Sequence, residues 1–283
     1  MNMRYMAMVI GTALTVAAQA WAGYEITATI QFERPGKDGI KHETMLIAYQ
    51  IDKKMGRFEF IEGNMPMMAK GTYLITRDGG ITMTLVNPAA KTCTAWNLEQ
   101  MMGMAGGALK LMNAQVTNPK SDKIVDETGP AILGYPTHHY KFVTSYGMEM
   151  AFMNMKQSTQ IEQEIEAWTS SKLAEVVFNP WARQQNPKTG IAQIDTLTEQ
   201  LMQQVKGFPL KQTTVNKSTD ASGRINISRT TMEVTGIKSI GMPAERFEVP
   251  AGYTSNEAAP GQNGQVNVEE LMKKALQEAG KAK

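Results

Sequence analysis

The stretch EITATIQF, Glu25 to Phe32, alternates between polar and apolar side chains. Its apolar members are Ile26, Ala28, Ile30 and Phe32, and its polar members are Glu25, Thr27, Thr29 and Gln31. Because successive side chains of a strand point to opposite faces of the sheet, this period of two is typical of a strand with one buried and one wet face. The stretch therefore predicts a β-sheet that packs on one side only.

The same alternation recurs along the chain. It is found at 45–51 and 81–85, and Asp78-Gly79-Gly80 is typical of a hairpin turn. Further strands are expected around these segments: 58–60, 93–96, 138–144, 148–155, 161–168, 210–217 and 225–235. Closely spaced strands separated by turn signals indicate an antiparallel meander. The fold class is thus predicted to be mainly β.

Two segments have a helical period instead. Apolar residues recur every three or four positions from Leu98 to Met112 and from Ile191 to Val205. Asn97 is the expected N-cap of the first helix, which contains three helix-weakening glycines, Gly103, Gly106 and Gly107. We expect these amphipathic helices to lie across the apolar face of the sheet, in an α+β arrangement dominated by strands.

The N-terminus has the features of a cleavable secretory signal. Arg4 precedes a short apolar run, and small residues end it at Ala20-Trp21-Ala22. The run is shorter than the about 20 residues that a spanning helix needs, which disfavours a retained membrane anchor. We predict a signal peptide at 1–22, cleaved after Ala22, a periplasmic or secreted location, and no membrane span in the mature chain.

The rest of the chain is expected to form one large domain and a tail. The β domain is predicted to span 23–253, followed by a flexible linker at 254–266 and an amphipathic helix at 267–283. That helix has two interpretations: it docks on its own domain, or it binds a protein partner or a membrane surface. The near balance of its charges counts against the membrane.

Composition and motifs disfavour several function classes. The chain has 29 basic and 27 acidic residues, which gives no strong field for nucleic acid. Its one cysteine, Cys93, is expected to be a small buried side chain. No zinc-protease, serine-hydrolase, P-loop or dithiol motif is present. His138 and His139 should point to opposite faces of a strand, and the row at Glu162, Glu164 and Glu166 should be a solvated edge. We therefore expect a non-enzyme without a cofactor.

Methionine is unusually frequent, with 22 residues. Three interpretations remain open: ordinary core packing, an adaptable apolar binding face, and soft thioether ligation of Cu(I). On a strand, Met148 and Met150 would share a face with Phe152, opposite Met153 and Met155, so one ion cannot gather them all. The candidate copper ligands are Met65, Met67, Met68, Met101, Met102 and Met104.

Four motifs in the second half resemble an uncharacterised periplasmic domain family. They are ETGPAILGYPTHHYKF (Glu127–Phe142), IEAWTS (Ile165–Ser170), GFPLK (Gly207–Lys211) and RFEVPAGY (Arg246–Tyr253). That family is similar to the outer-membrane lipoprotein carrier superfamily, LolA-like with LppX-like and RseB-like relatives. The resemblance implies a curved antiparallel half-barrel, closed by helices, whose apolar hollow holds lipid or acyl chains or senses lipoproteins.

Taken together, these features predict a periplasmic, non-enzymatic binding protein for a hydrophobic ligand. The ligand would be a lipid, an acyl chain or a lipoprotein, held in a methionine-rich hollow with Tyr73, Trp96 and Trp168 near its rim. The expected lining residues are Met101, Met102, Met104, Leu109, Met112, Met148, Met150 and Phe152. The alternatives are Cu(I) binding by the methionine clusters and protein interaction through the C-terminal helix.

Overall fold

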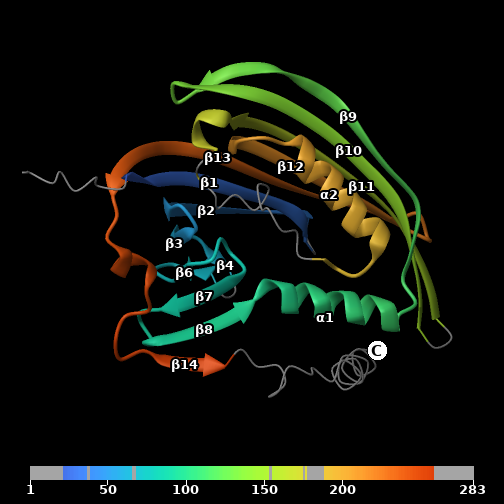
Figure 1. The fold of residues 1–283 in the computed structure, drawn as a ribbon. Helices are drawn as coiled ribbons and strands as arrows, with labels where there is room; N and C mark the ends of the chain where they lie inside the picture. The colour runs from blue at the N-terminus through green and yellow to red at the C-terminus, as the bar shows by residue number, and fades with distance from the viewer. Residues whose placement is uncertain are drawn as a thin grey trace, which may run out of the picture.

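The computed structural model describes residues 22–36, 39–65, 68–152, 155–174, 176 and 188–257, and most of them form one curved, open sheet (Figure 1). The sheet has 12 strands in the order β14-β8-β7-β6-β3-β2-β1-β13-β12-β11-β10-β9. Neighbours pair antiparallel, except that β14 pairs parallel with β8. The prediction of a mainly β, antiparallel protein is confirmed.

The strands differ greatly in length. Those of the large sheet are β1 (Ala22–Gly36), β2 (Gly39–Asp52), β3 (Met55–Glu62), β6 (Tyr73–Thr76), β7 (Thr82–Asn87), β8 (Thr92–Asn97), β9 (Gln115–Ile132), β10 (Tyr135–Phe152), β11 (Met155–Ser170), β12 (Phe208–Asp220), β13 (Ile225–Gly241) and β14 (Thr254–Glu257). A separate small hairpin pairs β4 (Asn64–Met65) with β5 (Met68–Ala69). The helices are α1 (Leu98–Leu111) and α2 (Ala192–Gln204), with short 3₁₀ turns η1 (Ser171–Leu173) and η2 (Ala244–Phe247).

Several strand boundaries differ from those expected. The two strands expected at 138–144 and 148–155 are one continuous strand, β10, because its register with β11 runs unbroken from His138 to Phe152. Strand β9 was not expected, and Ile81 precedes β7 and is exposed. Strand β14 occupies the first four residues of the expected linker. The expected signal peptide, apart from Ala22, and the C-terminal helix lie outside the described residues.

One face of the sheet carries the main core, and we call it the inner face. Ile26 and Ala28 of β1 are fully buried there, as the alternation of EITATIQF predicts. Side chains from five further strands join them in one cluster with Leu173 and Val176, which follow β11. The buried members are Ile26, Ala28, Met45, Ile47, Ile51, Phe58, Phe60, Met83, Leu173, Val176, Phe208, Leu210 and Val234.

A smaller core lies on the opposite face, which we call the outer face, over strands β6 to β8. Tyr73, Ile75, Val86 and Cys93 pack there with Val249 and Tyr253. Val249 and Tyr253 belong to RFEVPAGY, and Phe247 in the same segment is fully buried. This motif therefore covers the outer face of β6–β8 and leads the chain into β14. Cys93 is buried, as predicted.

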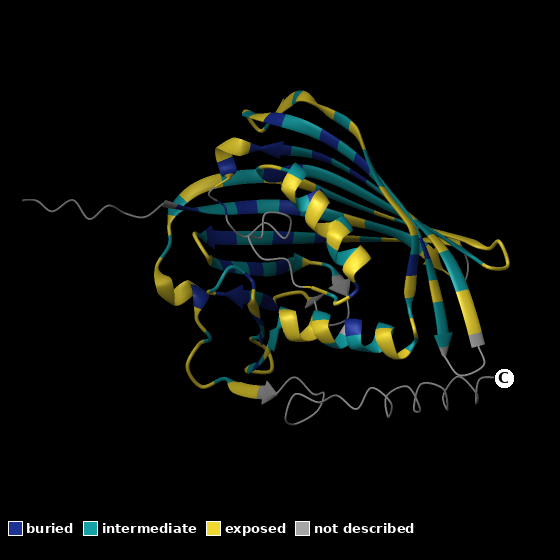
Figure 2. Ribbon diagram, turned by 45° about the vertical axis from the view of Figure 1, so that its right-hand side comes forward, coloured by how far each residue is buried: buried dark blue, intermediate teal, exposed yellow. Residues whose placement is uncertain are grey.

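Both helices start close to where the sequence predicts. The Asn97 side chain accepts a hydrogen bond from the Gln100 backbone N–H at 3.1 Å, so Asn97 is the N-cap of α1. Leu201 of α2 packs with Tyr140 and Phe142 of β10 and with Ile165 of β11. Figures 1 and 2 both show α2 on the inside of the bend, beside the long strands. The C-terminal turn of α2 is therefore attached to the inner face.

Replacing Phe247 by alanine should destabilise the fold by about 3–5 kcal/mol, because the ring is fully buried and the substitution leaves a cavity. Chemical unfolding followed by circular dichroism measures this change. The exposed neighbour Arg246→Ala is the control and should change the free energy of unfolding by less than about 0.5 kcal/mol. Equal effects of the two substitutions would contradict the role of RFEVPAGY as a cover for β6–β8.

Candidate functional site

The inner face has more apolar surface than its buried core uses. Eleven further hydrophobic residues pack against the core cluster but are only partly buried. They are Tyr24, Ile30, Phe32, Tyr49, Leu74, Leu85, Trp96, Ile132, Tyr135, Met232 and Ile237. Nine of them extend the apolar surface across the inner face from β13 through β1 to β8, and Ile132 and Tyr135 lie on β9 and β10. A surface of this kind can contact an apolar ligand.

The environment at the centre of this surface has a low polarity. The Tyr49 ring meets Phe58 edge to face, with centroids 5.3 Å apart. Burial raises the pKa of the Tyr49 hydroxyl to about 12, because the anion would be poorly solvated there. Burial likewise raises the pKa of the Tyr146 hydroxyl on β10.

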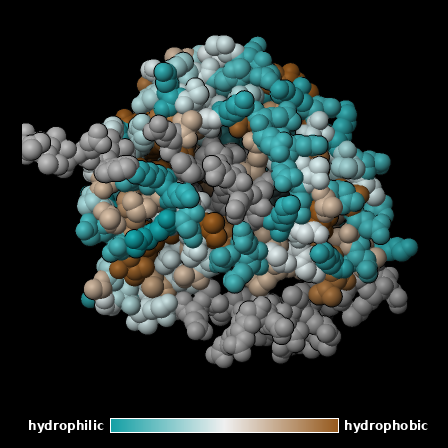
Figure 3. All heavy atoms as spheres, in the orientation of Figure 1, coloured by the Kyte–Doolittle hydropathy of each residue, from teal (hydrophilic) through white to brown (hydrophobic). Residues whose placement is uncertain are grey.

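The molecular surface seen in the orientation of Figure 1 is different. Hydrophilic residues cover most of it, and hydrophobic residues are scattered among them in small groups (Figure 3). Scattered exposed apolar side chains are normal for a globular protein. Figure 3 therefore shows no large hydrophobic patch among the described residues that face the viewer.

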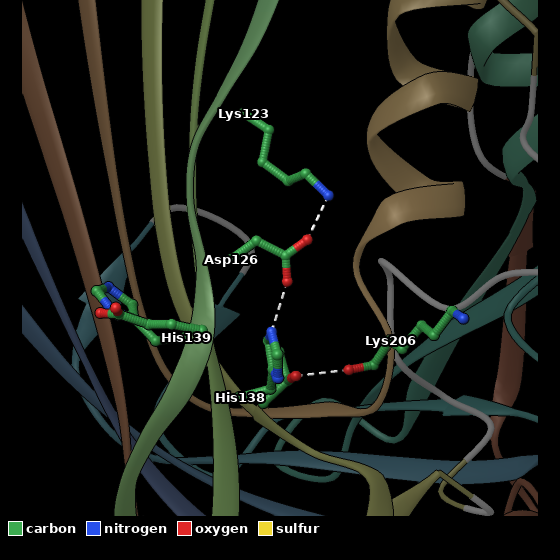
Figure 4. Close-up of polar contacts among 7 residues, drawn as sticks. Lys123, Asp126, His138, His139 and Lys206 are labelled. Carbon is green, nitrogen blue, oxygen red and sulfur yellow. Dashed lines mark hydrogen bonds and ion pairs between the residues drawn. The ribbon is translucent and has the colours of Figure 1, made fainter.

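A charged cluster borders the inner face where α2 ends. Asp126 of β9 contacts both Lys123 and His138, the latter with Nε2 and Oδ1 2.6 Å apart (Figure 4). The hydrogen bonds from Lys123 and His138 hold the pKa of the Asp126 carboxyl below its usual value. Tyr140, adjacent to this cluster, hydrogen-bonds with the main chain of Lys206 just after α2. The bond between Tyr140 and Lys206 attaches the segment that follows α2 to β10.

The two adjacent histidines point to opposite faces, as predicted (Figure 4). His139 stacks on Trp168 with ring centroids 4.4 Å apart, and its Nε2 is 2.9 Å from a Glu166 oxygen. Glu164 pairs with Lys141 at 2.9 Å. The glutamate row expected on β11 is thus a partly solvated ladder of ion pairs, which contributes little stability.

Two of the three aromatic residues expected at the rim of the hollow are elsewhere. Tyr73 is buried in the outer-face cluster, where Arg57 lies 3.5 Å from its ring centroid. Trp168 lies with His139 on the outer face of β11. Only Trp96 of the three packs with the inner-face cluster. The expectation failed because sequence alternation does not tell which of the two faces points inward.

The expected lining residues come from two elements that meet at one point. Met101, Met102, Met104 and Leu109 lie in α1, whose C-cap is Met112. Met148 and Met150 lie on β10, and the regular register with β11 puts them on the same face as Phe142. The Ala151 N–H donates to the Met112 carbonyl at 2.7 Å, which joins the end of α1 to the end of β10. Met101 is 44% exposed.

The methionines of the copper hypothesis belong to the β4–β5 segment and to α1. Met65 and Met68 pair along their backbones in the β4–β5 hairpin. Met67 lies outside the described residues, as do the side chains of Met65, Met68 and Phe152. Among His, Cys, Asp and Glu of the described part of the chain, no group of three or more is placed to hold a metal ion.

Helix α1 touches the segment that enters α2, a contact that the sequence did not predict. A Cβ on Gly106 would lie 1.5 Å from the Thr189 carbonyl oxygen, so only glycine allows this approach. Thr189 is itself fixed, because its N–H donates to Asp195 Oδ1 of the first turn of α2 at 2.7 Å. The glycine that weakens α1 by its propensity therefore permits contact between the two helical segments.

Gly106→Ala should destabilise the protein, because the new methyl group would overlap the Thr189 backbone. Gly103→Ala is the matched control in the same helix, where an added Cβ meets nothing within 4 Å. It should stabilise α1 by up to about 1 kcal/mol, the propensity difference between alanine and glycine. Thermal unfolding measures both changes. Stabilisation by both substitutions would contradict the packing of α1 against Thr189.

The protein belongs to the class of curved single-sheet β proteins. Its sheet has 12 strands, with an apolar cluster on the inner face and paired charges on the outer face. The chain belongs to a family of domains of unknown function, DUF4412, whose pattern it matches over residues 37–253. No curated protein matches the sequence. No helix among the described residues is long and apolar enough to cross a membrane.

Three solved structures have low similarity to this chain. PNGF-II is 12% identical at a TM-score of 0.29, with 82% of this chain and 32% of that chain covered. A putative outer membrane lipoprotein-sorting protein domain from Vibrio parahaemolyticus is 11% identical at a TM-score of 0.29, covering 81% and 90%. A DUF1329 family protein from Desulfovibrio piger is 10% identical at a TM-score of 0.29, covering 82% and 91%. The chain thus spans about a third of PNGF-II, the first of these proteins.

Proposed function

We propose that this protein is a non-enzymatic carrier or sensor that binds the acyl chain of a lipid or lipoprotein on the inner face of its sheet, in the periplasm. The observation that carries the proposal is the set of partly buried hydrophobic residues packed on the inner-face core. Side chains that only complete a core would be buried. These remain accessible on the inside of the bend.

The free energy gained by covering this apolar surface is sufficient for binding. Removing apolar surface from water contributes about 25 cal/mol per Å², so covering roughly 400 Å² gives about 10 kcal/mol. Association and ordering of the chain offset part of this gain. Because the interaction is non-directional, the inner face would select for apolar character and length rather than for one molecule.

The sequence resemblance to the lipoprotein carrier superfamily supports the same function. In that superfamily a curved half-barrel, closed by helices, holds lipid or acyl chains. Here α2 is attached to the inner face through Leu201, and α1 contacts the segment before α2 through Gly106. In this proposal the two helices close the inner face and move away when a ligand enters.

The alternative functions would give different results. Cu(I) binding would need thioether sulfurs from the β4–β5 hairpin and α1 to converge on one ion. Partner binding through the C-terminal helix concerns residues outside the described part of the chain. Neither is favoured by a contact among the described residues. A native mass spectrum of the protein would distinguish both from lipid binding.

Phe32→Asn should weaken binding of an apolar probe about tenfold or more, because it removes apolar surface from the inner face. Gln31→Asn is the matched control, since Gln31 is exposed on the outer face of the same strand. The probe is the uncharged dye N-phenylnaphthylamine, followed by fluorescence and displaced by dodecanol. Melting curves of the two variants verify that both remain folded.

Two results would overturn the proposed function. One is the absence of dye binding by the folded parent protein. The other is equal weakening by Phe32→Asn and Gln31→Asn, which would place the dye outside the inner face.

A further inference from the structure

The inner face changes character along β12 and β13. Past Met232, the last apolar residue of β13 in the core cluster, the side chains on this face are amides and hydroxyls. The register pairs Thr214 with Thr230, Asn216 with Ser228 and Ser218 with Asn226. We call this set, together with Gln212, the polar strip: Gln212, Thr214, Asn216, Ser218, Asn226, Ser228 and Thr230. None of its members carries a charge.

The charged residues of the same paired segments lie on the opposite face. Lys211 and Glu233 are paired in register there, and Lys217 and Arg229 lie on the same face because their positions are also odd-numbered. Lys217 lies 4.0 Å from Glu162, and Arg229 lies 3.6 Å from Glu33. A face that only meets water commonly carries charges, as this outer face does. Their absence from the polar strip indicates a different role.

At its Thr214–Thr230 pair the strip has apolar neighbours on both sides. Thr214 lies in register with Ile165 of β11, and Thr230 lies in register with Phe32 of β1. Beyond Phe32, the same face of β1 and β2 carries paired charges, Arg34 and Lys41 with Glu43. All strip residues except Asn226 are partly buried. Gln163 donates to Asn216 Oδ1 at 2.7 Å, and Gln212 donates to the Thr214 hydroxyl at 3.3 Å. These two hydrogen bonds hold the amides in place. The strip is therefore a fixed row of neutral hydrogen-bonding groups beside the apolar surface.

We propose that the ligand is an amphiphile with an uncharged, hydroxyl-bearing headgroup, which the polar strip binds while the acyl chain lies on the adjoining apolar surface. This inference rests on the proposed function and adds the class of headgroup. Hydroxyl and amide groups both donate and accept, so they match sugar or glycerol hydroxyls. An ionic headgroup would lose water there without gaining a counter-charge from the strip.

The test compares three probes that share a dodecyl chain: dodecyl maltoside, dodecyltrimethylammonium and dodecanoate. Each is titrated below its micelle concentration and followed by calorimetry. The maltoside should bind about tenfold more tightly than either ionic probe. The double variant Thr214→Val/Thr230→Val should reduce that preference about tenfold, because two hydroxyls on the strip are lost while the shape is kept.

The control is Thr213→Val/Thr231→Val. These threonines are also in register on β12 and β13, with hydroxyls 3.5 Å apart, but they lie on the outer face. This variant should keep the full preference for the maltoside. Equal loss of preference in both double variants would overturn the assignment of the headgroup to the strip.

The two levels of the proposal fail in different ways. Equal affinities of the parent protein for all three probes would overturn the headgroup assignment and leave the binding of acyl chains standing. Tighter binding of an ionic probe would have the same meaning. No binding of any dodecyl probe would overturn both the headgroup assignment and the proposed function.

Discussion

Burial of the even-numbered side chains of β1 is the constraint on which the rest of the structure depends. Ile26 and Ala28 are fully buried near the middle of the strand order, and neighbouring strands on both sides add their own apolar residues to the same cluster. Because a strand has a period of two, this burial fixes which side chains of every paired strand share the inner face. The positions of the polar strip and of the outer ion pairs follow from the same register.

The inner face is consequently divided into two chemically different parts. It is apolar around β1, β2 and β3 and where β12 begins and β13 ends, and it is neutral and polar along the paired segments 212–218 and 226–230. The ion pairs of Arg34 and Lys41 with Glu43 lie on the same face at the ends of β1 and β2. The division coincides with the position where Phe32 neighbours Thr230. An amphiphile placed across this boundary would match both parts, whereas a purely aliphatic core would have no use for the amides. The outer face, with charges paired across β10, β11 and β12, is built to face water.

Alternation and capping patterns in the sequence were sufficient to predict the fold class. Glu25–Phe32 predicts β1, Asn97 predicts the start of α1, and the adjacent histidines diverge as strand geometry requires. Strand β9 was missed because it is a largely polar edge strand interrupted by bulges, with Asn118 at a positive φ of 49°. Two strands were expected where β10 is continuous, and Gly147, between the two expected segments, lies within the strand close to the Thr117 side chain.

The candidate site was only partly predictable for a related reason. Periodicity shows that two side chains share a face, but only the register across neighbouring strands shows which face packs and which residues on separate strands meet. Trp96 and Trp168 are alike in sequence context, yet one lies in the inner cluster and the other on the outer face. The polar strip likewise combines residues of two strands. The role of Gly106 needed the position of Thr189, 83 residues away by their numbers.

The most direct test of the central claim is a native mass spectrum of the protein purified gently from a periplasm. If the inner face binds acyl chains, the spectrum will contain an adduct of several hundred daltons that organic extraction removes. Identification of that adduct as a lipid would support the account. A copper-sized adduct would favour the methionine sites instead. A bare mass under conditions that preserve lipid complexes of other proteins would contradict the claim and turn attention to the C-terminal helix.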